Sequence, residues 1–264
     1  MLLSVLSRPD GFLWFKKLLR DSHETTHAKK AHRRTAFELF RSLLERRIVE
    51  FHWSPSHRHP QVRVPSDLQA DFSIHQTLAL WLIDTIQALD PNAEDFALDI
   101  LTLAESILES PELILRRQLD RLKDLKMAEL KAEGVEYERR IEELEKLEHP
   151  KPKRDFIYET FNRFREAHPW IGQENIRPKS IAREMYENFH SFADYIREYD
   201  LHKVEGLLLR YLSEVYKVLE QTVPDHAKNE ELRSMALYFE KMVRSEEHTS
   251  ELQSHLNLVC RLLL

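Results

Sequence analysis

The chain has 264 residues, of which 42% are hydrophobic, 32% are charged and only four are glycine. This length allows one large domain or two small ones, with enough apolar residues for a packed core. The four glycines, at positions 11, 134, 172 and 206, lie far apart, which excludes a Rossmann fingerprint and a P-loop because both motifs need closely spaced glycines. Few glycines and many charged residues predict a mainly α-helical protein.

The net charge of −6 is unevenly distributed along the chain. Residues 1–70 hold 13 Lys and Arg against 7 Asp and Glu, which is a net charge of +6, so the remaining residues carry −12. A basic front on an acidic body predicts that the front meets a polyanion, whereas the alternative is that its basic side chains are only solvated.

Cysteine content and hydropathy limit the class of protein further. The single cysteine, Cys260, excludes a disulfide framework and a cysteine-based metal site. No apolar run approaches the ~20 residues that a membrane span needs. We therefore expect a soluble, cytoplasmic protein that does not contact a membrane.

The end of the chain does not read as protein sequence. Arg244–Ser254 reads RSEEHTSELQS, which is identical to the in-frame translation of a common short-read sequencing adapter. We expect residues 244–264 to be an artefactual tail, and we leave them out of the fold prediction. The natural C-terminus would then be absent from the sequence.

Residues 1–70 predict a compact winged-helix-like domain. Apolar residues recur at helical spacing in Phe12–Arg20 and in His27–Arg47, which predicts two amphipathic helices. The period then changes to two in Ile48–Trp53 and again in Gln61–Pro65, on either side of a polar turn. Two alternating runs around such a turn predict a small β-hairpin.

Residues 71–243 predict an all-α helical bundle. Helices are expected over Leu78–Leu89, Ala93–Glu109, Leu113–Leu147, Asp155–Ala167, Lys179–Tyr199, Val204–Val223 and Asn229–Val243. The third of these is long and densely charged, and its apolar stripe is narrow, which is typical of a hairpin arm or of a helix that lies half out of the body. Gly134 is the candidate break in it.

Basic residues of the first domain gather in a pattern typical of phosphate contact. They lie on one face of the second predicted helix and on the predicted hairpin, where His57 and His59 accompany them. The candidates are Lys29, Lys30, Arg33, Arg34 and Arg41 on the helix and Arg58 and Arg63 on the hairpin.

A second candidate site for phosphate lies in the bundle. Arg177 and Lys179 flank Pro178 just before a predicted helix, and helix N-termini attract anions. The alternative is an ordinary turn, with the helix capped at Pro178 or Ser180. Trp170 is a candidate for stacking on a base, although a tryptophan is more often a core residue.

One string has the spacing of a zinc hydrolase. His23-Glu24-Thr25-Thr26-His27 matches HExxH, in which two histidines on one helix face bind zinc and the glutamate activates water. The motif stands at a helix start, and a cluster of basic residues that would repel Zn²⁺ follows it. No serine stands in a nucleophile-elbow context either, so no catalytic residue and no metal ligand are predicted.

Seven stretches carry a resemblance to a known group of proteins. They are Arg20–Thr25, Asp71–Gln76, Gly134–Glu138, His168–Trp170, Pro178–Ser180, Arg183–Glu187 and Glu205–Ser213. From about Leu2 to Val243 the chain resembles the C-terminal region that follows the two RecA-like domains in a group of bacterial DEAD/DEAH-box helicases. These are similar to the superkiller and exosome-associated RNA helicases.

The resemblance implies a winged helix followed by a helical bundle that lines a nucleic-acid channel. Arg210 lies four residues after Gly206 in the stretch that resembles a late bundle helix, and it joins the candidates for nucleic-acid binding. The implied partners are single-stranded RNA and upstream RecA-like helicase domains in the same full-length chain.

Because the ATPase motifs have no counterpart here, no cofactor is expected in this chain, and ATP and Mg belong to the implied motor domains. The alternative is a stand-alone winged-helix DNA-binding regulator with a helical dimerisation body.

Overall fold

A computed structural model describes residue 5 and residues 10–45, 49–52, 61–63, 76–171 and 174–245. The chain is mainly α-helical, which confirms that part of the predicted fold class. It divides into two compact units. The first comprises Met1–Thr77 and Phe164–Glu174, and the second comprises Leu78–Arg163 and Asn175–Leu264.

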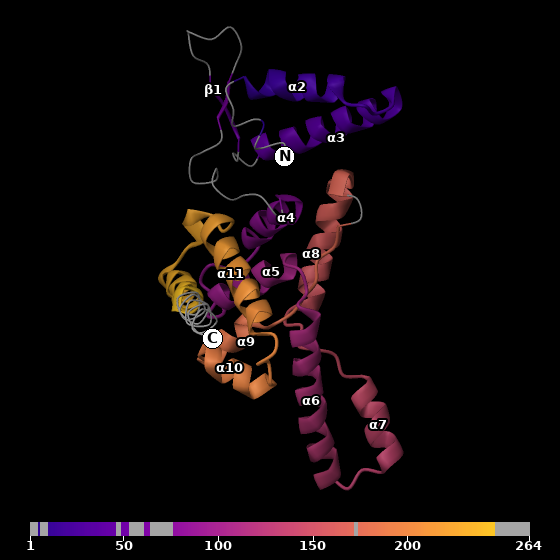
Figure 1. Cartoon of the computed structure of the whole chain (residues 1–264), viewed down its shortest axis with the longest axis vertical. Coiled ribbons are helices and arrows are strands. Elements are labelled where there is room, and N and C mark those ends of the chain that lie inside the picture. The colour runs from indigo at the N-terminus through magenta and orange to yellow at the C-terminus, as the bar shows by residue number, and fades with distance from the viewer. Residues whose placement is uncertain are drawn as a thin grey trace, which may run out of the picture. The chain divides into compact units, whose positions relative to one another are not determined.

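Where the structure describes residues 10–63, the first unit has two helices followed by two short strands (Figure 1). They are α2 (Gly11–Asp21), α3 (Thr26–Glu45), β1 (Glu50–His52) and β2 (Gln61–Arg63). Thr25 caps α3, because its Oγ1 accepts a hydrogen bond from the Ala28 N–H at 3.2 Å. The strands pair antiparallel with Phe51 opposite Val62, and the turn expected between them lies outside the described residues.

The second unit is built from helices that surround α5. Its elements are α4 (Gln76–Ile86), α5 (Phe96–Ile107), α6 (Glu112–Ala132), α7 (Tyr137–Glu145), α8 (Arg154–Ala167), α9 (Ala182–Glu187), α10 (Phe192–Tyr199), α11 (Glu205–Gln221) and a last helix over residues 230–245. Every residue of α5 except Leu98 is buried, and α9 and α11 pack against it. The end of α8, from Phe164, belongs to the first unit. Within the described parts of the chain, no helix combines the length and the apolarity needed to cross a bilayer.

The long charged helix predicted over Leu113–Leu147 consists of two helices, α6 and α7, which lie side by side (Figure 1). The break is at Gly134, whose φ of 72° lies in the left-handed region that favours glycine. The Val135 N–H donates to the Leu130 carbonyl and the Gly134 N–H to the Lys131 carbonyl, which is the usual hydrogen-bond pattern of a glycine stop. The hairpin arm was therefore predictable from Gly134.

The single helix predicted over Lys179–Tyr199 is wrong, because two short helices, α9 and α10, occupy this range. Between them Phe189 has a φ of 53°, which ends the first helix. Ser191 then starts the second, since its Oγ accepts a hydrogen bond from the Asp194 N–H at 3.2 Å. A serine that caps a new helix competes with continuation of the old one.

The N-terminus of α9 is capped by a side chain from another helix, and not by Pro178 or Ser180 as predicted. Glu105 of α5 is fully buried, and its Oε1 accepts hydrogen bonds from the N–H groups of Ile181 and Ala182 at 2.8 Å each. Its Oε2 accepts from the Arg183 N–H at 3.1 Å, and the Tyr211 hydroxyl of α11 donates to Oε1 at 2.8 Å. One carboxylate thus joins α5, α9 and α11.

Replacing Glu105 with alanine should lower the free energy of unfolding by about 3 kcal/mol, because three buried N–H groups and one buried O–H lose their acceptor. Chemical denaturation followed by circular dichroism measures this change. The matched control is Glu109→Ala, which removes an exposed glutamate just beyond α5 and should change stability by less than about 0.5 kcal/mol. Equal stabilities of the two variants would contradict the capping role.

Candidate nucleic-acid interface

The five basic candidates of the first helical pair all lie on α3, but they do not form one uniform basic face. Arg33, Arg34 and Arg41 are exposed, as is Lys30, whereas Lys29 is half-buried. Arg34 and Arg41 form a neutralised stripe, whereas the other three form no ion pair with a residue that the structure describes.

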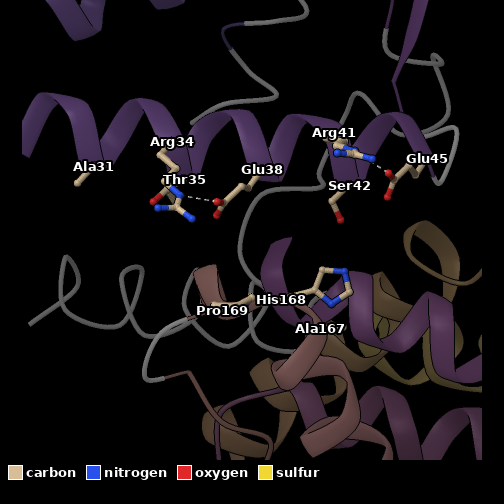
Figure 2. Close-up of a pocket in the computed structure, with 10 residues that line it drawn as sticks. All are labelled: Ala31, Arg34, Thr35, Glu38, Arg41, Ser42, Glu45, Ala167, His168 and Pro169. Atoms are coloured by element: carbon tan, nitrogen blue, oxygen red, sulfur yellow. Dashed lines mark hydrogen bonds and ion pairs between the residues drawn. The ribbon is translucent and has the colours of Figure 1, made fainter.

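Arg34 and Arg41 belong to the neutralised stripe. The Nε of Arg34 lies 2.9 Å from Oε1 of Glu38, and the Nε of Arg41 lies 2.9 Å from Oε1 of Glu45 (Figure 2). Both arginine side chains are more than 70% exposed, so each pair stabilises the helix only slightly. The two carboxylates nevertheless cancel the positive charge of this stripe.

This stripe faces residues 167–169 across a hollow of about 580 Å³ (Figure 2). His168 lies on the far side, where its Nδ1 is 2.8 Å from the Phe164 carbonyl and its ring lies 4.2 Å from the Phe164 ring. With two arginines and two glutamates on α3, the hollow carries little net charge. It is therefore not a strong site for a polyanion.

Lys30 and Arg33 have no ion-pair partner among the described residues. Lys29 differs from them, since its Nζ donates a 2.7 Å hydrogen bond to the Arg20 carbonyl at the end of α2. This bond ties the first turn of α3 to the last turn of α2. Arg33 follows Lys29 by one turn and lines the groove between the two helices.

The groove between α2 and α3 is basic at one end and apolar at the other. It is lined by Leu13, Phe15, Lys16, Lys17, Leu19 and Arg20 of α2 and by Arg33, Ala36, Phe37 and Phe40 of α3, and the α3 residues have the helical i, i+3, i+4, i+7 spacing. We call this the α2–α3 groove, and its volume is about 770 Å³. The two helices run antiparallel (Figure 1), so the four basic residues gather at one end, where the Nε of Arg20 also lies 2.9 Å from Oδ1 of Asp21.

The basic residues of α2 were not among the binding candidates predicted from the sequence. Lys16, Lys17 and Arg20 are exposed, and Lys17 places its Nζ 5.1 Å from the centre of the Trp14 ring, within range of a cation–π interaction. Their spacing along an amphipathic helix was a signal that could have found them. Apolar Leu13 and Phe37 at the other end of the groove are also exposed, Phe37 to 66%.

The predicted hairpin contributed two basic candidates, Arg58 and Arg63. Arg58 lies outside the described residues, as do His57 and His59. Arg63 is in β2 opposite Glu50, and the structure describes its backbone but not its side chain. The side chain of Trp170, the candidate for base stacking, is outside it too.

The side chain of Lys179 is fully buried, so it cannot contact a nucleic acid at the surface as predicted. Its Nζ donates hydrogen bonds to the Leu108 carbonyl at 2.7 Å and to the Arg177 carbonyl at 3.0 Å. Burial lowers the pKa of Lys179 to about 7, and the nearby charge of Glu105 opposes that shift. The anion predicted at this helix N-terminus is the carboxylate of Glu105 itself.

The two remaining candidates, Arg177 and Arg210, are exposed in the second unit. Arg177 lines a polar hollow together with Arg116, His149 and Lys151. Arg210 lies on α11 and is not among the residues that line this hollow.

The zinc-hydrolase string does not have the geometry that the motif needs. His23 and Glu24 lie in the bend before α3, whereas His27 lies in its first turn, so the two histidines do not share a helix face. All three side chains are exposed. Among the side chains that the structure describes, no three His, Cys, Asp or Glu residues gather as metal ligands.

Comparison with known proteins identifies a family. The family model of the domain of unknown function (DUF3516) matches residues 1–251. The chain belongs to this family. No curated protein matches the chain, and no solved structure does.

The pKa of Lys179 predicts how stability depends on pH. An unfolded lysine titrates near pH 10.4, so between about pH 7 and 10 the unfolded chain binds more protons than the folded chain, and stability rises with pH. The Lys179→Met variant lacks this contribution. The difference in free energy of unfolding, wild type minus variant, should therefore grow by up to about 1.4 kcal/mol per pH unit between about pH 8 and 9.

Denaturant titrations at several pH values measure that difference. Lys203→Met is the control, because Lys203 is exposed and its replacement should give a difference that does not change with pH. A constant difference for Lys179→Met as well would contradict the lowered pKa.

Proposed function

We propose that this member of the DUF3516 family is an accessory nucleic-acid-binding region of an ATP-dependent DEAD/DEAH-box helicase, and that it binds single-stranded RNA. The helicase assignment rests on the resemblance of Leu2–Val243 to such C-terminal regions, with ATP and Mg bound by upstream RecA-like domains. The observation that carries the binding proposal is the α2–α3 groove.

The groove offers a strand the two kinds of contact that single-stranded nucleic acids use. Lys16, Lys17 and Arg33 form a basic end for phosphates, beside Arg20, whose charge is paired with Asp21. The exposed ring of Phe37 at the apolar end offers a face on which a base can stack. Phosphate contacts and stacking both tolerate any sequence, so binding should be salt-sensitive and sequence-blind.

In this proposal the first unit is winged-helix-like, with β1 and β2 as the wing that follows α3. The order of two helices and an antiparallel strand pair supports this finer assignment. The same order favours the second candidate function, a stand-alone DNA-binding regulator in which α3 enters a major groove. Tight, sequence-specific binding to duplex DNA distinguishes the regulator from the helicase accessory region.

Reversing the charge of the two unpartnered basic residues of α3 should weaken RNA binding. The Lys30→Glu/Arg33→Glu variant should bind single-stranded RNA less tightly, and the slope of log K against log salt should fall by about 0.7 for each phosphate that the variant no longer neutralises. Fluorescence anisotropy across a salt series measures both quantities. The control, Lys131→Glu/Arg139→Glu, carries the same charge change on exposed residues of the second unit.

Equal weakening by the two double variants would assign the effect to net charge and would contradict the groove. The absence of salt-sensitive binding to any nucleic acid would contradict the proposed function as a whole.

Removing the exposed ring of Phe37 should weaken RNA binding without unfolding the protein. We expect Phe37→Ala to reduce affinity for single-stranded RNA by about tenfold, since stacking of one base contributes about 1–3 kcal/mol. Its melting temperature should stay close to that of the wild type, because the side chain is 66% exposed. The control is Leu125→Ala, which truncates a residue of similar exposure on α6, and an unchanged affinity of Phe37→Ala would contradict stacking.

A further inference from the structure

A polar hollow in the second unit gathers polar side chains, most of them basic, from four segments of the chain. Arg116 comes from α6, His149 and Lys151 from the segment between α7 and α8, Tyr158 from α8, and Arg177 from the segment before α9. The volume of the hollow is about 450 Å³, which lies in the range of small-molecule sites. We call it the Arg116–Arg177 hollow.

Its guanidinium groups are available for a ligand. Arg116 and Arg177 are exposed, and neither forms an ion pair with another residue that the structure describes. Lys151 adds a third positive charge, although its Nζ also lies 2.6 Å from Oε2 of Glu148. Glu112 is the one carboxylate among the described residues that line the hollow, so the lining has an excess of positive charge.

The position of Arg177 is fixed by its own backbone. Its N–H donates a 2.8 Å hydrogen bond to the Ser106 carbonyl at the end of α5. Its carbonyl accepts a hydrogen bond from the buried Nζ of Lys179 at 3.0 Å, and Pro178 restricts the chain between them. These contacts fix the backbone from which the Arg177 side chain extends, so a ligand has to order only the side chain.

The remaining lining residues define the kind of anion. His149 is half-buried, and burial followed by the charge of Lys151 lowers its pKa, so its neutral ring can donate one N–H to a ligand. Tyr158 and Asn175 add polar groups, whereas Leu115, Leu119 and Pro178 form an apolar wall. The hollow therefore combines a site for a doubly charged oxyanion with a wall for an organic group.

We propose that the Arg116–Arg177 hollow binds a phosphomonoester of nucleotide size, with the guanidiniums of Arg116 and Arg177 on the phosphate and the apolar wall on the organic part. Arginine suits this role because its planar donors match phosphate oxygens in pairs. Such a phosphomonoester is carried by a free mononucleotide and by the 5′-phosphorylated end of a nucleic-acid strand. The hollow contains no residue of the α2–α3 groove, so this inference does not depend on the proposed RNA binding.

Isothermal titration of the 264-residue chain with inorganic phosphate and with AMP tests the site. We expect saturable binding of one AMP per chain, weakened at least about tenfold by Arg116→Gln and by Arg177→Gln. Glu112→Gln should tighten binding about twofold to fivefold, because it removes the carboxylate that repels the anion. Arg139→Gln, on α7, is the matched control and should bind AMP as the wild type does.

A pair of oligoribonucleotides of one sequence, with a 5′-phosphate or a 5′-hydroxyl, distinguishes the two sources. A preference for the phosphorylated strand that AMP abolishes by competition supports a strand end, whereas AMP binding without that preference supports a free mononucleotide. AMP binding that survives in Arg116→Gln/Arg177→Gln, or no saturable binding of phosphate or AMP in the millimolar range, overturns the proposal. Lys30→Glu/Arg33→Glu should leave AMP binding unchanged, which separates this result from the outcome at the α2–α3 groove.

Discussion

The buried carboxylate of Glu105 is the interaction on which the core of the second unit depends. A carboxylate without water is costly unless several donors surround it, and here three backbone N–H groups and one tyrosine hydroxyl do so. Burial raises the pKa of Glu105, while these donors oppose that rise by favouring the charged form. The four hydrogen bonds fix where α9 begins and hold α11 against α5. The positions of the neighbouring segments follow from that constraint.

The same constraint determines which basic residues reach the surface. The segment before α9 is drawn against the end of α5, where the Leu108 carbonyl accepts a hydrogen bond from Lys179. Lys179 is thereby buried, while Arg177, two residues earlier, remains exposed. Two basic residues that look equivalent in sequence thus have opposite roles, one supporting the backbone and the other facing the Arg116–Arg177 hollow.

Much of the helical architecture could be predicted from the sequence, because apolar periodicity and chain-breaking residues act locally. The glycine at 134 predicted the break between α6 and α7, and the helix expected over Val204–Val223 is α11. The cap on α9 could not be predicted, since Glu105 lies 76 residues before Ile181 and only the folded chain brings them together. The burial of Lys179 was missed for the same reason.

The neutralised stripe of α3, by contrast, could have been predicted from the sequence. Glu38 and Glu45 follow Arg34 and Arg41 by four residues, the spacing at which opposite charges pair on a helix. The stripe contains two arginines, but each has a glutamate one turn away, so its net charge is close to zero.

Charge neutralisation by near neighbours also distinguishes the basic residues within α3. Many basic side chains of the described chain, such as Arg163 with Glu159 and Lys217 with Glu214, have an acidic partner three or four residues away. Lys30 and Arg33 depart from this pattern, because no Asp or Glu stands three or four residues from either of them. Since Lys30 and Arg33 are not neutralised in this way, the surface of α3 beside the exposed ring of Phe37 keeps a positive electrostatic potential. Under the proposed function, this potential would attract the phosphates of a strand, and the exposed ring of Phe37 would distinguish a strand from a simple anion, which has no base to stack.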